Sequence, residues 1–392
     1  MKKKKHFETD AIRIQVNRSS QKEHSVPVFA TSSFVFSNAE EARAAFADEI
    51  EAHVYSRLSN PNTDEFIDKL CRLENTEDGC ATSTGMAAIF LAFTSHLRAG
   101  DHIVASRSIF GSTHQLLTNI LPRWGITHTY VSIDKNEEWE NAIMPQTRLL
   151  FTETPSNPGL DICDLQFVGK LAKMHNCLFV VDNSFATPYL QNPDDYGAHL
   201  ICHSATKFID GQGRVLGGAI LGPKYVIQDV RAMARQTGPS MSSFDAWLLS
   251  KSMETLAVRM DKHCENAQKL AQYLEKSKKV TSVKYPFLNS HPQVSLAKKQ
   301  MKLGGALVTF EIPGDTKRCI KFLDNLKMIS LTPNLGDTRT TITHPASTTH
   351  SKLSDEEKSA VNISNNLVRI SIGLENIDDI VTDIEQSLAK LK

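Results

Sequence analysis

The 392-residue sequence has no long apolar run and no excess of charge of one sign. A membrane-spanning helix needs about 18 or more consecutive apolar residues, and no such run occurs, so we expect no transmembrane segment. Lysine plus arginine and aspartate plus glutamate number 44 each, which leaves no overall attraction to nucleic acid or to an anionic membrane. We therefore expect small molecules as substrates, and neither nucleic acid nor membrane as a partner.

Cysteine is sparse, and its spacing argues against two common uses. The seven cysteines are odd in number and contain no C-x-x-C pair, which disfavours both a disulfide framework and a zinc site. A reducing cytoplasm is the expected location, with no metal. The opening MKKKK is followed by the charged stretch HFETDAIRIQV, where a signal peptide needs about 7 to 15 apolar residues, so we expect a solvated tail.

A dinucleotide-binding fingerprint is also missing. In GQGRVLG, from Gly211, the third glycine falls at 217, whereas G-x-G-x-x-G requires it at 216, and the segment follows a lysine instead of opening a long helix. The segment is predicted to be a turn. A nicotinamide-dependent oxidoreductase, which would be colourless and bind NAD, stays a disfavoured alternative.

The order of apolar and amphipathic segments predicts three parts. Residues 1–60 lack periodicity and are expected to form an extended arm. Residues 61–254 alternate helical segments with short apolar runs, which predicts a doubly wound α/β domain with a mainly parallel sheet. Residues 255–392 combine amphipathic helices with strands such as GGALVTFEI and LVRISIG, which predicts a smaller α+β domain. The runs read as strands of the larger sheet are 103–106, 127–133, 148–156, 177–184, 199–207 and 217–222.

Lys207, in HSATKFIDGQGR, is the residue most suggestive of chemistry. The apolar run HLIC leads into it, so it is expected at the carboxyl end of a buried strand, where α/β enzymes place their sites. A lysine catalyses by forming a Schiff base, and pyridoxal phosphate requires four protein groups: the lysine, an acid at the pyridine nitrogen, a phosphate site and a stacking ring. Asp182, which ends the run LFVVD, is the candidate acid, although a turn or capping aspartate would look the same.

The candidate phosphate site combines a helix start with hydroxyl groups. In ATSTGMAAIFLAF the amides of Gly85 and Met86 could face an anion from a helix N-terminus, and Ser204 and Thr206 would add hydroxyl donors. A simple helix cap is the alternative interpretation of this stretch.

Two arginines are candidates for anion recognition. Arg57, with Tyr55 on the same face of the extended arm, could neutralise the phosphate once Lys207 is occupied. Arg369 alternates with apolar residues in LVRISIG and could bind an amino-acid carboxylate through its planar fork, although an arginine on a solvated strand face is the plainer interpretation.

Together these segments resemble the Cys/Met metabolism family of pyridoxal-phosphate enzymes, of aspartate-aminotransferase fold type (fold type I). The motifs that carry the resemblance span nearly the whole chain: VYSRLSNPN, TSTGMAAI, TETPSNP, VVDNSFATP, HSATKFIDGQG, NLGDTRTTITHPASTTH and VRISIGLEN. The resemblance implies a large domain with a seven-stranded mainly parallel sheet and a homotetramer built of dimers, in which Tyr55 and Arg57 reach the phosphate of the neighbouring subunit. It also implies the site: Lys207 as the cofactor lysine, Asp182 at the pyridine nitrogen, Gly85, Met86, Ser204 and Thr206 at the phosphate, Asn157 near the cofactor oxygen and the substrate carboxylate, and Arg369 at that carboxylate.

Two departures from the family pattern narrow the expected activity. Phe110 stands where most members have the stacking tyrosine, so stacking survives but a phenolic acid or base is lost. Asn334 begins NLGD, near the substrate, where cystathionine γ-synthases have serine-leucine-glycine-glycine. These segments are similar to bacterial O-succinylhomoserine sulfhydrylases, which implies conversion of O-succinylhomoserine and sulfide to homocysteine and succinate, a step of methionine synthesis.

Several alternatives stay open at this point. Within the fold they are a cystathionine γ-synthase, an O-acetylhomoserine sulfhydrylase and a methionine or cystathionine γ-lyase. A non-catalytic protein that kept the fold would be expected to lose Lys207 or Asp182, and both are present. The roles of Ser112, His344 and His350 are open, with local hydrogen bonding the favoured interpretation for each histidine.

Overall fold

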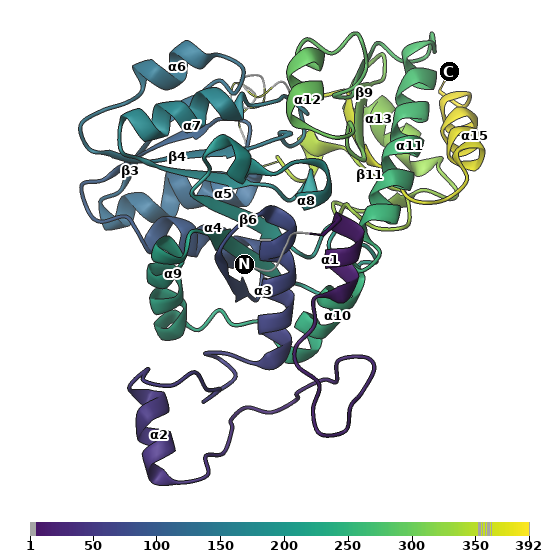
Figure 1. Cartoon of the computed structure of the whole chain (residues 1–392). Coiled ribbons are helices and arrows are strands. Elements are labelled where there is room, and N and C mark those ends of the chain that lie inside the picture. The colour runs from purple at the N-terminus through teal and green to yellow at the C-terminus, as the bar shows by residue number, and fades with distance from the viewer. Residues whose placement is uncertain are drawn as a thin grey trace.

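The fold is built on two sheets that lie in separate domains, with an N-terminal arm beside them (Figure 1). The computed structural model describes residues 5–391 except 352, 353, 355, 357, 359, 360 and 362. The solvated tail that we expected at residues 1–4 lies outside the described residues.

The larger sheet has seven strands in the order β1-β7-β6-β5-β4-β2-β3. Strands β2 to β6 pair in parallel, and β7 is antiparallel to both of its neighbours, which confirms the predicted mainly parallel sheet. All six predicted strands are present, and β1 is an additional one. The bounds are β1 Asp78–Thr82, β2 His102–Ser106, β3 Thr127–Val131, β4 Thr147–Glu153, β5 Leu178–Asp182, β6 Leu200–Ser204 and β7 Gly218–Gly222.

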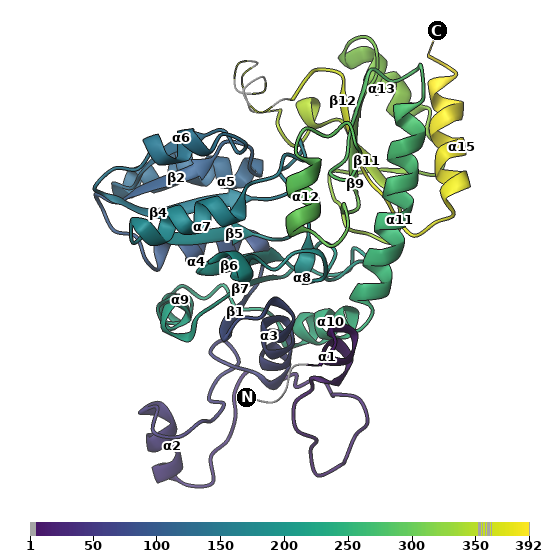
Figure 2. The same cartoon turned by 45° about the horizontal axis from the view of Figure 1, so that its top comes forward.

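Both faces of this sheet are covered by helices (Figure 2). In β5, Phe179 and Val181 pack into one core and Val180 into the other, so the strand is apolar on both sides, as parallel strands are. The helices on the first face are α3 Pro61–Glu74, α6 Asn136–Asn141, α7 Leu165–Met174 and α10 Ser243–Met253, and those on the second are α4 Gly85–Thr94, α5 Gly111–Gln115 and α9 Lys224–Thr237. Short helical segments complete the domain: η1 Leu116–Ile120, η2 Leu121–Trp124, α8 Thr187–Leu190 and η3 Pro193–Tyr196.

The smaller domain has a five-stranded sheet in the order β10-β11-β12-β9-β8, which is antiparallel except for the β10–β11 pair. In β12, Val368 and Ile370 pack into the core of this domain, which places Arg369 on the opposite face. Three helices share that core: α11 Leu256–Glu275, α13 Thr316–Asp324 and α15 Ile377–Leu388. The remaining bounds are β8 Ser282–Lys284, α12 Val294–Gln300, β9 Leu307–Glu311, β10 Ser330–Leu331, β11 Thr341–Thr343, η4 Pro345–Ser347 and β12 Leu367–Ser371.

The arm is less uniformly extended than the sequence predicted, because it contains helices α1 Phe7–Arg13 and α2 Ala39–Phe46. Helix α1 packs against the body: Ala11 is buried in the first core, and the amide of Val16 donates to Glu65 at 3.1 Å. The segment that carries α2 projects away from the rest of the chain in both views and leaves Val35 98% and Phe46 72% exposed (Figures 1 and 2). Only the later part of residues 1–60 is therefore a free arm.

All seven cysteines are described, and all carry free thiols. Six are buried and Cys80 is partly buried, and burial raises the pKa of every one of these thiols. In the described part of the chain, no helix is both long and apolar enough to span a bilayer.

Candidate active site

The site lies at the carboxyl edge of the parallel strands, where β4, β5 and β6 end side by side. Lys207 comes three residues after the end of β6, and its Nζ donates to Asn334 Oδ1 at 2.6 Å. Burial, together with the positive charge of Arg369, lowers the pKa of Lys207 to about 8, while the negative charge of Asp182 opposes that shift. A larger fraction of Lys207 is therefore a neutral amine near physiological pH than of an ordinary lysine.

Asp182 ends β5 and is held at only one carboxylate oxygen. Ser184 donates to Asp182 Oδ1 twice, from its hydroxyl at 2.5 Å and from its amide at 3.0 Å. No described residue hydrogen-bonds to Oδ2. Burial raises the pKa of Asp182, and the Ser184 hydrogen bonds act in the opposite direction. A buried carboxylate with one oxygen free of protein partners fits a protonated heterocyclic nitrogen.

The start of α4 approaches β6 so closely that only glycine fits at the contact. Thr84 caps the helix by accepting the amide of Ala87 at 3.0 Å, which leaves the amides of Gly85 and Met86 in the first turn, where the helix provides no acceptor. A Cβ on Gly85 would lie 2.6 Å from the Ser204 Cβ. Gly85, Met86 and Ser204 border one cavity, so helix amides and a hydroxyl group lie together as an anion site requires.

The hydroxyl of Thr206 is also partly engaged within the protein. It accepts the amide of Gly217 at 3.1 Å, and it lines the same cavity as Ser204. It also donates to the carbonyl of Gly217 at 3.4 Å, a long contact that the hydroxyl can exchange for one to an anion by rotating.

Arg369 and Asn157 form a buried pair beside Lys207. Arg369 is 2% exposed; its Nη1 donates to Asn157 Oδ1 at 2.9 Å and its Nη2 to the carbonyl of Pro333 at 2.8 Å. Burial lowers the pKa of Arg369 to about 10, so the side chain is still cationic at pH 7. Its position on β12 brings a charge from the smaller domain to the edge of the larger sheet. The solvated strand face that we weighed as the plainer interpretation is wrong.

Glu153 is a residue of this site that the sequence analysis missed. It ends β4 in register with Asp182, and its Oε2 accepts the amide of Phe110 at 2.9 Å. Burial and the nearby charge of Asp182 raise the pKa of Glu153 well above its usual value. The sequence contained a signal for Glu153, because an acid follows the apolar run before TETP just as Asp182 follows the apolar residues of LFVVD.

Two adjoining cavities meet at Lys207. The inner cavity has a volume of about 220 Å³, and its lining includes Gly85, Met86, Phe110, Glu153, Asn157, Asp182, Ser204, Thr206, Lys207 and Arg369. The outer cavity, of about 430 Å³, is lined by Asn334, Ser112, Gln115, His350 and neighbouring hydroxyl residues. Phe110 and Lys207 border both cavities. Ten of the twelve predicted site residues are therefore brought together, including Asn334 at the outer cavity.

Tyr55 and Arg57 are the two predicted site residues that the chain does not bring to these cavities. Arg57 donates to the carbonyl of Arg235 and borders a different cavity. Tyr55 is 43% exposed, with the Arg57 guanidinium 5.6 Å from its ring centroid. Their role in a neighbouring subunit stays a prediction.

The two histidines whose roles were open differ in their surroundings. His344 is hydrogen-bonded at both ring nitrogens, to Ser347 at 2.8 Å and to the carbonyl of Asn365 at 3.1 Å, as expected for a structural residue. His350 borders the outer cavity and contacts Thr349 through Nδ1 at 2.8 Å. Burial lowers the pKa of His350 to about 4, so it is neutral at physiological pH.

Comparison with known proteins identifies the family. The model of the Cys/Met metabolism PLP-dependent enzymes matches residues 8–389. The chain belongs to this family. Pyridoxal phosphate (PLP) is therefore its cofactor, and the free Asp182 oxygen and the space beside Gly85 fit the two ends of that molecule.

Relatives within the family divide between two activities. The chain is 42% identical to an O-succinylhomoserine sulfhydrylase of Pseudomonas aeruginosa, over 98% of this chain and 96% of that one. It is 44% identical to an L-methionine γ-lyase of Porphyromonas gingivalis, over 93% and 92% of the two chains.

Solved structures of the family share the fold. The metB protein of Corynebacterium glutamicum superposes with a TM-score of 0.94 at 36% identity, over 99% of each chain. A putative O-acetylhomoserine (thiol)-lyase of Campylobacter jejuni, which contains a pyridoxyl-lysine phosphate, superposes with a TM-score of 0.95 at 33% identity, over 98% of this chain and 100% of that one. These matches confirm the predicted fold type.

The pKa of Lys207 leads to a testable pH dependence. Only the neutral amine attacks an aldehyde, so attachment of PLP to the apoprotein should speed up about tenfold per pH unit below pH 8 and level off above it. Stopped-flow absorbance, recorded from about pH 6 to about pH 10, measures this profile. Arg369→Met removes the repelling charge and should move the midpoint upward. A wild-type midpoint at the ordinary lysine value of 10.5 would contradict the assignment.

Proposed function

We propose that this enzyme catalyses γ-replacement: O-succinylhomoserine and sulfide give homocysteine and succinate. The carbon–oxygen bond at Cγ breaks, a carbon–sulfur bond forms at the same carbon, and succinate leaves with the bonding electron pair. The relatives named O-succinylhomoserine sulfhydrylase support this reaction.

The observation that carries the proposal is Phe110 at the border of both cavities. A phenylalanine cannot donate a proton to a leaving group. An acyloxy group departs as a carboxylate, whose acid has a pKa of about 4, and needs no proton; a thiolate, with a thiol pKa of about 8.5 or more, benefits from one. The missing hydroxyl therefore favours an acylated homoserine over methionine as substrate.

Each predicted site residue of the inner cavity has a proposed role toward cofactor or substrate. PLP, when bound, supplies an electron sink for the electrons left on the substrate carbon after proton removal. Asp182 would keep the proton on the pyridine nitrogen, and the amides of Gly85 and Met86 would bind the phosphate. Ser204 and Thr206 would add hydroxyl contacts to that phosphate, and Phe110 would stack on the ring.

Lys207 and Arg369 would act on the amino-acid substrate. Arg369, with Asn157 fixing its guanidinium, would hold the α-carboxylate through two parallel hydrogen bonds. The Lys207 amine, which Asn334 holds, would then accept the α-proton and return it later in the cycle. Because Phe110 is not ionisable, Lys207 would carry most of the proton traffic.

A neighbouring copy of the chain would complete the phosphate site. Lys207 and Arg369 are the only lysine or arginine side chains among the described residues that line the inner cavity, and both are assigned to the substrate. The projecting arm, with Tyr55 and Arg57 on it, would supply the missing cation to a second subunit, as part of a homotetramer built of dimers.

A side-by-side assay tests the reaction. O-succinyl-, O-acetyl- and O-phosphohomoserine are each offered with sulfide or with cysteine, and products are separated by chromatography. We expect homocysteine as the main product from O-succinylhomoserine and sulfide. Cystathionine as the main product, with little homocysteine, would show a cystathionine γ-synthase instead. The homoserine derivative with the highest kcat/KM is the preferred substrate.

Methionine γ-lyase is the second candidate, because those relatives reach 44% identity. This activity would convert methionine and water to methanethiol, ammonia and a 2-oxo acid. We expect methionine turnover to be slower than γ-replacement, and Phe110→Tyr to raise it by about tenfold or more by restoring an acid. Faster turnover of methionine than of any acylated homoserine in the wild type would reverse the assignment.

A further inference from the structure

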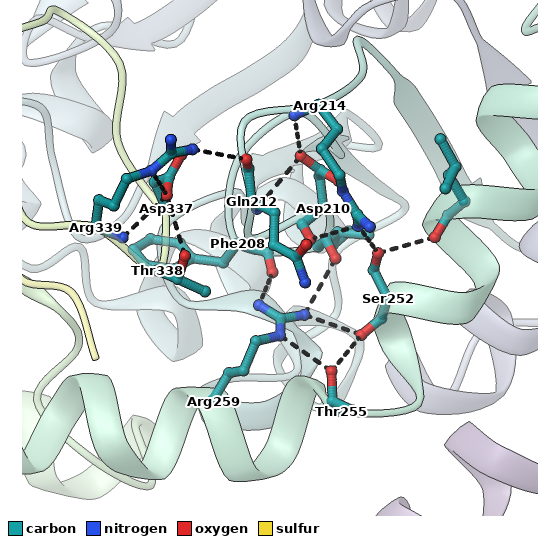
Figure 3. Close-up of polar contacts among 12 residues, drawn as sticks. Phe208, Asp210, Gln212, Arg214, Ser252, Thr255, Arg259, Asp337, Thr338 and Arg339 are labelled. Carbon is teal, nitrogen blue, oxygen red and sulfur yellow. Dashed lines mark hydrogen bonds and ion pairs between the residues drawn. The ribbon is translucent and has the colours of Figure 1, made fainter. Parts of the chain in front are cut away.

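The turn that follows Lys207 is held by a buried arginine of the next domain. Arg259, on α11, is 5% exposed, and its guanidinium donates to the carbonyls of Phe208 at 2.6 Å and Ile209 at 3.2 Å (Figure 3). It also donates to the carbonyl of Ser252 at 3.0 Å and to the Thr255 hydroxyl at 3.3 Å. One side chain thus binds the two residues directly after Lys207 and the start of its own helix.

Two glycines show how closely this turn is packed. Gly211 has φ +70°, and a Cβ there would lie 2.1 Å from Arg259 Nη1. Gly336 has φ +81°, and its Cβ would lie 2.6 Å from the Phe208 amide nitrogen and 2.8 Å from the Lys207 carbonyl carbon. The backbone of Lys207 is therefore enclosed between the Asn334 turn and the Arg259 guanidinium.

The same face of α11 also binds the segment directly after β12, the strand that carries Arg369. His263 and Asn266 follow Arg259 at i+4 and i+7, which places all three on one side of the helix. His263 Nδ1 donates to the carbonyl of Ile372 at 2.6 Å, and Asn266 donates to the carbonyl of Gly373 at 3.1 Å. Burial lowers the pKa of His263 to about 4, so the ring is neutral and its proton is on Nδ1.

We propose that Arg259, His263 and Asn266 form a spacer on α11 that fixes the separation of Lys207 from Arg369. Arg259 is a positioning residue for Lys207, and His263 is one for Arg369; the proposal relies on the roles assigned to those two groups under the proposed function. Lys207 and Arg369 belong to different domains, and a misplacement of 1 Å in such a pair costs about 100-fold in rate. Helix α11 binds the backbone one and two residues after Lys207 and three residues after Arg369, and it therefore keeps that distance constant.

The bonding of Arg259 favours positioning over charge pairing. All four of its hydrogen-bond acceptors are uncharged, and it forms no ion pair within the described residues. The carboxylate of Asp210, in the same turn, is instead paired with Arg214 at 2.9 Å (Figure 3). A buried cation without an ionic partner contributes little net stability. The contribution of Arg259 is therefore its planar guanidinium, whose donors bind several carbonyls at fixed positions.

Substitution of Arg259 by lysine tests the link to Lys207. Lysine keeps the charge but cannot bind three carbonyls in one plane. In the holoenzyme of R259K we expect kcat to fall about tenfold or more, while KM stays within about threefold of the wild-type value. The pH midpoint of the cofactor's visible absorbance should shift as well. Arg148→Lys is the matched control, because Arg148 also donates to two carbonyls, those of Pro145 and Thr147, at the far end of β4. It should change neither value.

Substitution of His263 tests the link to Arg369. His263→Asn keeps an N–H donor near Nδ1, whereas His263→Leu removes it. The binding of L-alanine is measured by titration, with the cofactor absorbance as the signal. We expect His263→Leu to weaken this binding about tenfold or more, and His263→Asn to keep most of the wild-type affinity. This titration needs no γ-leaving group, so it decides the proposal even if the product assay identifies another substrate.

Two results would overturn the spacer. One is an R259K enzyme with a lower melting temperature but wild-type kcat and absorbance midpoint per bound cofactor, which would make Arg259 structural only. The other is equal binding of L-alanine by the leucine and asparagine variants of His263. If R259K fails to fold, the His263 pair decides alone.

Discussion

Lys207→Ala should lower kcat by about 10⁴-fold or more, because the variant would lose the two functions proposed for this side chain, the covalent anchor of the cofactor and the base for the α-proton. The protein should fold normally, since Lys207 Nζ contributes one hydrogen bond, to Asn334, and no ion pair within the described residues. Steady-state kinetics with O-succinylhomoserine and sulfide, on protein saturated with PLP, gives the rate.

Borohydride reduction adds a check that is independent of activity. Reduction followed by peptide mapping should place the pyridoxyl group on the peptide that contains Lys207 in the wild type, and on no peptide in the variant. Lys279→Ala is a suitable control, because Lys279 is exposed and its one ion pair within the described residues is with Glu385 at 2.8 Å. A pyridoxyl group on any other lysine would show that Lys207 is not the cofactor lysine. A Lys207→Ala variant that keeps more than a small fraction of wild-type kcat would contradict the catalytic role of Lys207.

Asp182→Asn should lower kcat by about 10²- to 10³-fold. The asparagine can still accept both Ser184 hydrogen bonds through Oδ1, so the local structure should persist. Its amide nitrogen takes the place of Oδ2, however, and can only donate, so it cannot hold a protonated pyridine nitrogen. The cofactor should still bind but lose its capacity as an electron sink.

Ser184→Ala is the matched control for this substitution. It keeps the carboxylate of Asp182 and removes the 2.5 Å hydroxyl contact, together with the acceptor of the Ser204 amide at 2.7 Å, so we expect less than about a tenfold loss of kcat. Cofactor content, measured by absorbance, separates loss of binding from loss of chemistry. An Asp182→Asn enzyme as active as the wild type would show that the ring nitrogen needs no anion.

The sequence predicted the groups that end apolar strands, because a buried strand and a polar residue after it are both visible in the local pattern. Lys207 and Asp182 were found in this way, and Arg369 by its alternation with Val368 and Ile370. Strand β1 was missed because DGCAT has no apolar run, and it is held at the sheet edge by pairing with β7. The helices of the arm were missed because short helices depend on neighbours that a local pattern does not contain.

Residues that act over long sequence distances could not be found in this way. Arg259 binds carbonyls about fifty positions earlier, and on the amphipathic helix α11 it looks like an ordinary solvated arginine. Its burial is a property of the docked domains, which composition and periodicity do not encode. The same holds for Arg57, whose proposed partner is a second copy of the chain.

The buried thiols have a consequence for an enzyme that handles sulfur compounds. Thiol–disulfide exchange proceeds through the thiolate, and the pKa of each of the seven cysteines is raised, to about 11 for Cys80, the most accessible of them. Mixed disulfides between these cysteines and small reactive thiols should therefore form slowly. Its own sulfur atoms stay chemically separate from the sulfur that passes through the cavity.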